Sequence, residues 1–214
     1  MSRAPGTAKP NPSCPGILRE PGSWNKAQTH EFIQGKFHFK MGNRKSYCQP
    51  GAIHELTFST FKKQHLLADS RDKQFVLDAI CSAKSSQNFH LLAYAIMSNH
   101  IHLLIFPQSE NYKISKILYA IKSPSAIKIL ARMKESKNKI YSLTEISAGR
   151  HRLWQTGGGY DRIITEPNEV ITSIEYIENN PVKANLVRTS ENYMYSSASD
   201  RKSPIPQLVD PLPF

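Results

Sequence analysis

The feature that most constrains the fold is a pair of apolar runs separated by a short polar break. The runs cover residues 89–97 and 101–106, and the break contains Ser98-Asn99. Runs of this length and composition predict strands that are buried on both faces. So short a break predicts a tight turn that pairs the two strands antiparallel, and Pro107 ends the second strand. The fold must therefore contain a sheet built around this hairpin.

The segments on either side of the hairpin carry strand and helix patterns. Residues 52–60 mix β-branched and aromatic side chains and predict a strand. Residues 70–86 and 113–122 place apolar side chains at helical spacing. Ser123-Pro124 then predicts a kink or a new helix start, after which a basic amphipathic piece runs to about Lys134.

The remaining segments complete the order of elements. Residues 135–152 are polar and predict a loop, and residues 160–165 predict a short strand. Pro167 suits the first turn of a last helix, which Pro181 stops. The whole order predicts an α+β, ferredoxin-like βαββαβ fold with an antiparallel sheet and an additional C-terminal helix.

Composition divides the chain into a folded centre and two proline-rich ends. Nine of the 14 prolines lie before residue 22 or after residue 203. Such segments bury too little apolar surface to offset the entropy lost on ordering. We therefore expect residues 1–48 to be a disordered extension, residues 49–200 to form one domain, and residues 201–214 to be a flexible tail.

Composition also narrows the location and the partner. The 214 residues contain no apolar run of the roughly 18–20 residues that a membrane span needs, and no secretory signal. Cys14, Cys48 and Cys81 form no close pair, which favours free thiols in a reducing, cytoplasmic compartment. The net charge of +11 favours nucleic acid as the partner, with simple solubility as the alternative.

His100 and His102 are the first candidates for chemistry. Side chains at positions i and i+2 point to the same face of a strand, so these two imidazoles stand side by side on an otherwise apolar segment. Two neutral imidazoles can share a divalent metal ion. The alternative is that one or both are hydrogen-bonded structural histidines, as we expect for His54 and His90.

Tyr176 and Asn180, on the last helix, form the second candidate pair. The apolar positions of this helix define one stripe, and Tyr176 lies about 150° from its centre at 100° per residue. Asn180 follows one turn later on the same face, so a phenol and a carboxamide oxygen can converge. A surface tyrosine beside a helix-ending asparagine is the plain alternative.

Together the two pairs suggest phosphoryl transfer. A metal ion held by His100, His102 and the carboxamide oxygen of Asn180 can polarise a phosphoryl oxygen. Tyr176 can then attack phosphorus and form a covalent phosphotyrosine. Because a phenol is also a competent leaving group, the same site can cut a strand or rejoin it.

These residues stand in segments that resemble a known family. The segment MSNHIHLLI resembles the His-hydrophobic-His strand of the single-tyrosine HUH, or IS200-like, transposases. The segments LWQTGGGYDR, YIENNPVKANLV and YMYSSA are similar to the REP-associated tyrosine transposase branch. The resemblance spans roughly residues 50–200. It depends on the conjunction of the His-x-His strand with the Tyr-Ile-x-x-Asn-Pro-Val segment.

The resemblance implies a reaction and a role for each residue. It implies nicking and strand transfer on single-stranded or hairpin-bearing DNA through a 5′-phosphotyrosine, with Tyr176 as the nucleophile. His100, His102 and Asn180 would hold Mg²⁺ or Mn²⁺, although imidazole ligands also suit zinc. The protein would be a monomer or a homodimer, with no membrane partner. Glu178 departs from the family, which often has histidine at that position, and its effect stays open.

The run Gly157-Gly158-Gly159 lacks the Lys-Ser/Thr ending of a phosphate-binding loop. It predicts a flexible bend, or a place where the backbone approaches DNA or the sheet closely. The flanking Trp154 and Tyr160 could stack on bases. Packing is the more common role for such aromatic residues.

Basic side chains concentrate between the histidines and the tyrosine. Residues 113–152 hold ten basic and two acidic side chains, so this segment carries +8 of the net +11. Such a cluster suits phosphate contacts and predicts salt-dependent binding, with a solvated basic face as the alternative. The candidate DNA contacts are Lys113, Lys116, Lys122, Lys128, Arg132, Arg150 and Arg152.

Two other functions fit the same residues. One is a domesticated DNA-binding protein of this fold without turnover. The other is a metal-dependent phosphodiesterase in which water replaces the tyrosine as nucleophile. Loss of cleavage in Tyr176→Phe separates the transesterase from the phosphodiesterase.

Overall fold

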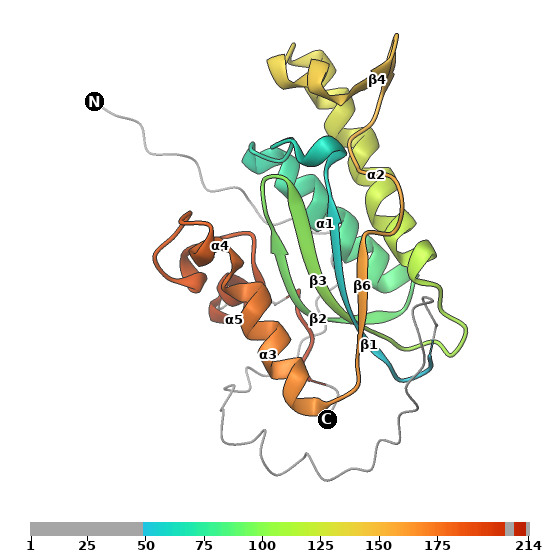
Figure 1. Cartoon of the computed structure of the whole chain (residues 1–214), viewed down its shortest axis with the longest axis vertical. Coiled ribbons are helices and arrows are strands. Elements are labelled where there is room, and N and C mark those ends of the chain that lie inside the picture. Colours follow the sequence, from blue (N-terminus) through green and yellow to red (C-terminus); the bar gives the residue numbers. More distant parts are fainter. Residues whose placement is uncertain (1–48, 204–207, 213–214) are drawn as a thin grey trace.

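A four-stranded antiparallel sheet with the strand order β2-β3-β1-β6 forms the centre of the molecule (Figure 1). The structure is a computed structural model that describes residues 49–203 and 208–212. The expected hairpin is present as β2 and β3, and β1 pairs with the other edge of β3. The strands are β1 (Ile53–Ser59), β2 (Phe89–Ile96), β3 (His100–Pro107) and β6 (Tyr160–Ile164).

The connections between these strands confirm the predicted fold class. Helix α1 (Ser70–Ser86) joins β1 to β2, and helix α2 (Ile114–Glu135) joins β3 to β6. Each connection passes over one strand that lies between its ends, which is the split βαβ arrangement of a ferredoxin-like fold. The additional C-terminal helix is present as α3 (Pro167–Glu178).

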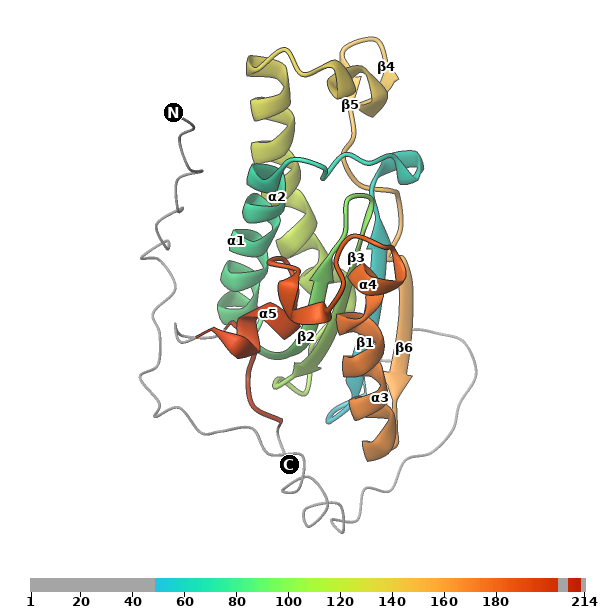
Figure 2. The same cartoon turned by 90° about the vertical axis from the view of Figure 1, so that its left-hand side faces the viewer.

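Helices cover both faces of the sheet, with α1 and α2 on one side and α3 on the other (Figures 1 and 2). Leu56, Phe58 and Leu103 belong to the core on the side of α1 and α2. Leu104 belongs to the smaller core on the side of α3, together with Ile174. Because successive strand residues face opposite sides, coverage on both faces explains why β2 and β3 are apolar almost without a break.

Helix α3 is fixed to the sheet by apolar contacts and by a buried polar group. The Glu55 carboxylate accepts hydrogen bonds from Ser173 Oγ at 3.1 Å and from Arg162 Nη2 at 2.8 Å. Val170 and Ile177 of α3 are buried on either side of Ser173. Since a buried carboxylate is costly without partners, this group sets the position of α3 on the sheet.

Helix α2 is continuous, so the break expected at Ser123-Pro124 is a proline inside one helix. Proline leaves a carbonyl of the preceding turn without its usual backbone donor. Next to this point, side chains add hydrogen bonds to two other carbonyls of the helix. Ser125 Oγ donates to the carbonyl of Ile121 at 2.7 Å, and Trp154 Nε1 donates to that of Lys122 at 2.9 Å.

The segment 135–152, which we expected to be a loop, contains regular structure. It forms a 3-10 helix at Lys139–Thr144 and a small hairpin of β4 (Glu145–Ser147) and β5 (Arg150–His151). The rings of Tyr141 and His151 stack with centroids 3.9 Å apart. This β4–β5 arm projects beyond one end of the sheet (Figures 1 and 2).

The chain after α3 also differs from expectation. Pro181 does not end the helical region but lies in the first turn of α4 (Asn180–Lys183). A flexible tail was expected from residue 201, yet Arg201 and Lys202 belong to α5 (Ser197–Lys202). Residues 208–212 pack on the domain, where Val209 is buried and the Asp210 carboxylate accepts from the Leu91 backbone N–H at 2.8 Å. The expected disordered extension, 1–48, lies outside the described residues.

Two expectations about the chain's environment can be compared with the structure. No helix of the described residues is long and apolar enough to cross a membrane. Cys81 on α1 is disulfide-bonded, so the expectation of free thiols is wrong for this residue. The cytoplasmic location remains an expectation.

Candidate active site

His100 and His102 lie at the start of the central strand β3, on the face that α3 covers. In the sheet register, His102 is opposite Thr57 of β1 and Ala95 of β2, and His100 is opposite Ser59 of β1. The two imidazole rings are edge-to-face with centroids 4.9 Å apart. The expected side-by-side placement is therefore present.

His102 presents a buried nitrogen that is left unpaired within the described part of the chain. Its Nδ1 is 2.8 Å from Thr57 Oγ1, whereas its Nε2 has no hydrogen-bond partner there. Burial, together with the neighbouring His100, lowers the pKa of His102 to about 4. The ring is therefore neutral near pH 7. A buried polar atom without a partner is costly, which makes Nε2 the natural atom to receive a ligand.

His100 is oriented by the residue before it. Its Nδ1 lies 2.6 Å from Asn99 Oδ1, and a carboxamide oxygen can only accept, so Nδ1 carries the proton. Asn99 is itself held, because its Nδ2 donates to the carbonyl of Lys63 at 3.3 Å and its carbonyl accepts from Thr60. Burial and the positive charge of Lys63 lower the pKa of His100. In the neutral ring, Nε2 is then the atom with a lone pair.

Tyr176 of α3 lies over His102. The two rings meet edge-to-face with centroids 5.8 Å apart. The Tyr176 side chain is 43% exposed, although its helix neighbour Ile177 is fully buried. Lys183 Nζ of α4 also lies near Tyr176, 4.4 Å from the centroid of its ring. A reachable phenol thus stands beside the imidazole pair and an ammonium group.

Asn180, which was expected on the same helix as Tyr176, is the first residue of α4 and is tied to the end of α3. Its Nδ2 donates to the backbone carbonyls of Tyr176 at 2.8 Å and Ile177 at 3.4 Å. The carboxamide oxygen is the part of this side chain that could still act as a ligand. The described contacts bring together His100, His102 and Tyr176, whereas those of Asn180 keep it with α3.

Glu178, whose effect the sequence left open, is used in packing. Its Oε1 accepts from Ser197 Oγ at 2.7 Å and from Arg201 Nε at 2.9 Å, both on α5. Arg201 also donates to the carbonyl of Leu92 on β2. Glu178 therefore links the end of α3 to α5 and to the sheet.

The donor set fits a divalent metal ion that is completed by oxygen ligands. The described residues contain no group of three His, Cys, Asp or Glu side chains that could hold a metal. The imidazole pair is nevertheless the neutral, preoriented kind of donor that divalent metals use, and Nε2 of His102 is the buried orphan atom. A phosphate oxygen, water and the carboxamide of Asn180 are the hard ligands that would complete such a site.

The structure separates the basic candidates into structural and exposed side chains. Arg132 is held in ion pairs, because Asp72 binds its Nε at 2.7 Å and Asp69 binds its Nη1 at 3.2 Å, and its part in DNA binding stays a prediction. Lys122 donates to the carbonyls of Gln155 and Gly157, so it holds a loop. The fully exposed candidates are Lys113, Lys116, Lys128 and Arg150.

Arg152 is half-buried, with its guanidinium 5.9 Å from the Phe61 ring centroid. Its part in DNA binding stays a prediction. The same holds for the four exposed candidates. His54 is structural, as expected: it is fully buried and bonded to Asp161 and Tyr112.

The glycine run makes the predicted close approach to the sheet. Gly159 has φ +82, and a Cβ there would come 2.1 Å from the Thr57 carbonyl oxygen. Of the two flanking aromatics, Trp154 is 5% exposed and packs edge-to-face on Phe58. Tyr160 is 53% exposed. Of these two aromatic residues, Trp154 is therefore a packing residue, whereas Tyr160 is not buried.

Three residues of the site were not expected from the sequence. Lys183 follows Tyr176 by seven residues, about two helical turns, so spacing could have suggested it. Asn99 is adjacent to His100, but its role needs the conformation of the turn. Thr57 needs the register between β1 and β3, which the apolar pattern does not specify.

Comparisons with known proteins concern the family and the fold of the chain. A family model described as Transposase IS200 like matches residues 51–180. A solved REP-associated tyrosine transposase bound to a REP hairpin superposes with a TM-score of 0.56 at 17% identity, covering 80% of this chain and 92% of that chain. At this identity the likeness shows the fold alone.

A second solved structure, of a candidate transposase from Deinococcus radiodurans R1, gives a TM-score of 0.41 at 20% identity. That match covers 66% of this chain and 97% of the other. No curated protein matches the chain.

Proposed function

The chain belongs to the IS200-like transposase family, and from this premise we propose that it nicks and rejoins single-stranded DNA through a 5′-phosphotyrosine on Tyr176. The observation that carries the proposal is the position of the Tyr176 ring at 5.8 Å from that of His102. His102 Nε2 is buried and has no partner among the described residues. A candidate nucleophile thus lies beside an imidazole nitrogen that can accept a metal ion.

Tyr176 performs the covalent step. Its Oη attacks the scissile phosphorus, the bond from phosphorus to the 3′ oxygen of the preceding nucleotide breaks, and the phenol proton ends on that oxygen as a 3′-hydroxyl. The DNA 5′ end stays on Tyr176 as a phosphodiester. Attack by a 3′-hydroxyl on this phosphotyrosine reverses the step and joins strands without an added energy source.

His100 and His102, with Asn180, would hold Mg²⁺ or Mn²⁺. When bound, that ion supplies Lewis-acid polarisation of a non-bridging phosphate oxygen. Asn99 and Thr57 hold the Nδ1 atoms of the two rings away from the site, which leaves both Nε2 atoms for coordination. Lys183 places a positive charge beside the Tyr176 ring, where the phosphate brings negative charge.

The proposed substrate is single-stranded DNA that carries a hairpin. The structural neighbour is bound to a REP hairpin, and the likeness of fold supports a similar shape of ligand here. Exposed basic side chains on α2 and β5 supply the positive charge that phosphate contacts need.

The test uses the full chain and a pool of stem–loop oligonucleotides with randomised single-stranded flanks, in the presence of Mn²⁺ or Mg²⁺. We expect a DNA–protein adduct that resists SDS, and its loss in Tyr176→Phe and in His102→Ala. Cleavage that survives in Tyr176→Phe would indicate a phosphodiesterase that uses water. Binding without adduct or cleavage, with either ion, would indicate a binding protein without turnover.

A further inference from the structure

Tyr160 lies in line with the candidate site across the sheet. Tyr160 of β6 is opposite Thr57 of β1, and Thr57 is opposite His102 of β3. Opposite residues of neighbouring strands share a face, so all three side chains lie on the face that carries Tyr176. With strands about 4.8 Å apart, the backbone of Tyr160 is roughly 10 Å from that of His102.

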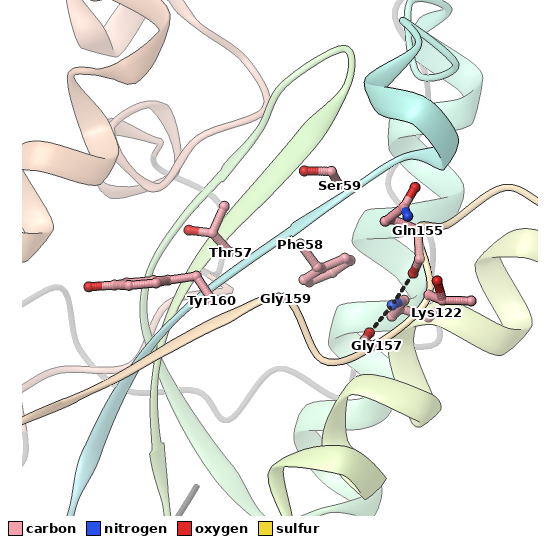
Figure 3. A pocket seen from close by; sticks show the side chains of 9 residues that line it. Thr57, Phe58, Ser59, Lys122, Gln155, Gly157, Gly159 and Tyr160 are labelled. Atoms are coloured by element: carbon pink, nitrogen blue, oxygen red, sulfur yellow. Dashed lines mark hydrogen bonds between the residues drawn. The ribbon is translucent and has the colours of Figure 1, made fainter. Parts of the chain in front are cut away.

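The Tyr160 ring is available on this face. Its side chain is 53% exposed, and no aromatic ring of the described residues stacks on it. Figure 3 shows its ring extending from β6 on the same side as the Thr57 side chain. Packing buries Trp154, whereas Tyr160 keeps an exposed ring in line with the candidate site, where it can contact a ligand.

A pocket of about 200 Å³ lies where β1 and β6 separate, with Phe58, Lys122 and Gln155 on the side away from the Tyr160 ring (Figure 3). The pocket exists because the chain leaves β1 after Gln155, which bonds to the Ser59 carbonyl at 2.9 Å, and returns only at Tyr160. Its walls include Phe58, Gln155 and Gly157.

The pocket is held in shape by its own residues. Lys122 Nζ donates to the carbonyls of Gln155 at 3.1 Å and Gly157 at 2.9 Å. Gly159 lies so close to β1 that any side chain there would meet the Thr57 carbonyl. These contacts fix the backbone at the start of β6, from which the Tyr160 ring extends.

We propose that Tyr160 binds one nucleobase of the single-stranded DNA close to the scissile phosphate, with the base stacked on its ring. The proposal rests on the proposed function and names how its substrate is held. Exposed aromatic rings beside a cationic surface are the usual platform for unpaired bases, because every base has a π-face. Stacking here fixes the strand in register with Tyr176.

The experiment measures DNA binding without chemistry, in the Tyr176→Phe background. The probe is a fluorescein-labelled stem–loop with a single-stranded thymidine flank, and the readout is fluorescence anisotropy. Tyr160→Leu should weaken binding roughly 5- to 150-fold, the range for the loss of one stacked base. Tyr160→Phe keeps the aromatic face and should bind as the parent does.

Tyr119→Leu is the control for the loss of a surface tyrosine, because Tyr119 is 72% exposed on α2, over the opposite face of the sheet. It should weaken binding less than Tyr160→Leu does. In a second readout, 5-iodouracil placed along the flank should photocrosslink to Tyr160. This readout uses the unaltered residue and does not depend on whether Tyr160→Leu folds.

Parent-like binding by Tyr160→Leu with crosslinks elsewhere would overturn the proposal. An equal loss in Tyr160→Phe would also overturn it, since the hydroxyl and not the ring face would then matter. An equal loss in Tyr119→Leu would show a general effect of removing surface tyrosines. None of these results touches the adduct test of Tyr176, so the two proposals fail separately.

Discussion

One hydrogen bond decides which nitrogen of His102 faces the candidate site. Thr57 Oγ1 holds Nδ1 at 2.8 Å, and Nε2 is left buried and unpaired among the described residues. Outer partners of this kind set the tautomer and the ring orientation of metal-binding histidines. The sequence singled out His100 and His102 by their spacing within one strand, and Tyr176 by its place on one helix. It did not identify Thr57, which reaches His102 only through strand pairing.

Thr57→Val removes this hydrogen bond while keeping the shape of the side chain. We expect Mn²⁺ affinity to fall roughly 10- to 100-fold, the range for outer partners of metal ligands. Titration of Mn²⁺ followed by electron paramagnetic resonance measures it without DNA. Thr57→Ser, which keeps the hydroxyl, should bind Mn²⁺ as the wild type does. Equal affinity in Thr57→Val would contradict the orienting role.

Arg132 shows why charge alone does not identify a DNA contact. Asp72 is fully buried, and Arg132 is its partner across the seam between α1 and α2. Arg132→Ala should lower the free energy of unfolding by about 3–5 kcal/mol, because it leaves a buried carboxylate unpaired. Urea unfolding followed by circular dichroism measures this. Lys116→Ala, at an exposed site of the same helix, should leave stability unchanged.

At the scale of elements, the sequence predicted strongly periodic segments well and irregular ones badly. The helix expected at 70–86 has those bounds as α1. A kink or a new helix start was expected at Ser123-Pro124, where α2 is one continuous helix. The β4–β5 arm was missed because its short strands are polar and turn at Gly149.

Gly159 tests the junction between β1 and β6. Its positive φ alone costs a residue with a side chain roughly 1–3 kcal/mol, and the approach to the Thr57 carbonyl adds to it. Gly159→Ala should therefore lower the melting temperature and reduce DNA binding. Gly158→Ala is the control, since a Cβ there would meet only Leu118 Cδ1 at an ordinary 3.8 Å. Equal melting temperatures for the two variants would contradict the close approach.

At the scale of the whole molecule, the basic segment that lies between the histidines and the tyrosine in sequence is spread over a different part of the structure. Helix α2 covers the face of the sheet opposite α3, and the β4–β5 arm projects beyond its end (Figures 1 and 2). The sequence predicted the amount of charge but not this separation, which depends on how the helices pack. We therefore predict that a bound strand extends from the site toward these elements.

The salt dependence of DNA affinity tests the contact of DNA with α2 and the β4–β5 arm. For single-stranded DNA, each phosphate contact contributes about 0.7 to the slope of log affinity against log salt concentration. Lys116→Ala and Arg150→Ala should each reduce the slope by about this amount, in anisotropy titrations at several KCl concentrations. An unchanged slope in both variants would place the DNA on another surface.

The account depends most directly on which atom becomes bonded to DNA. The measurement is mass spectrometry of the SDS-resistant adduct after digestion with nuclease and trypsin. The account predicts a nucleotide phosphate on the peptide that contains Tyr176, attached through its phenolic oxygen. A nucleotide on any other residue, or cleaved DNA with a free 5′-phosphate and no adduct, would contradict it.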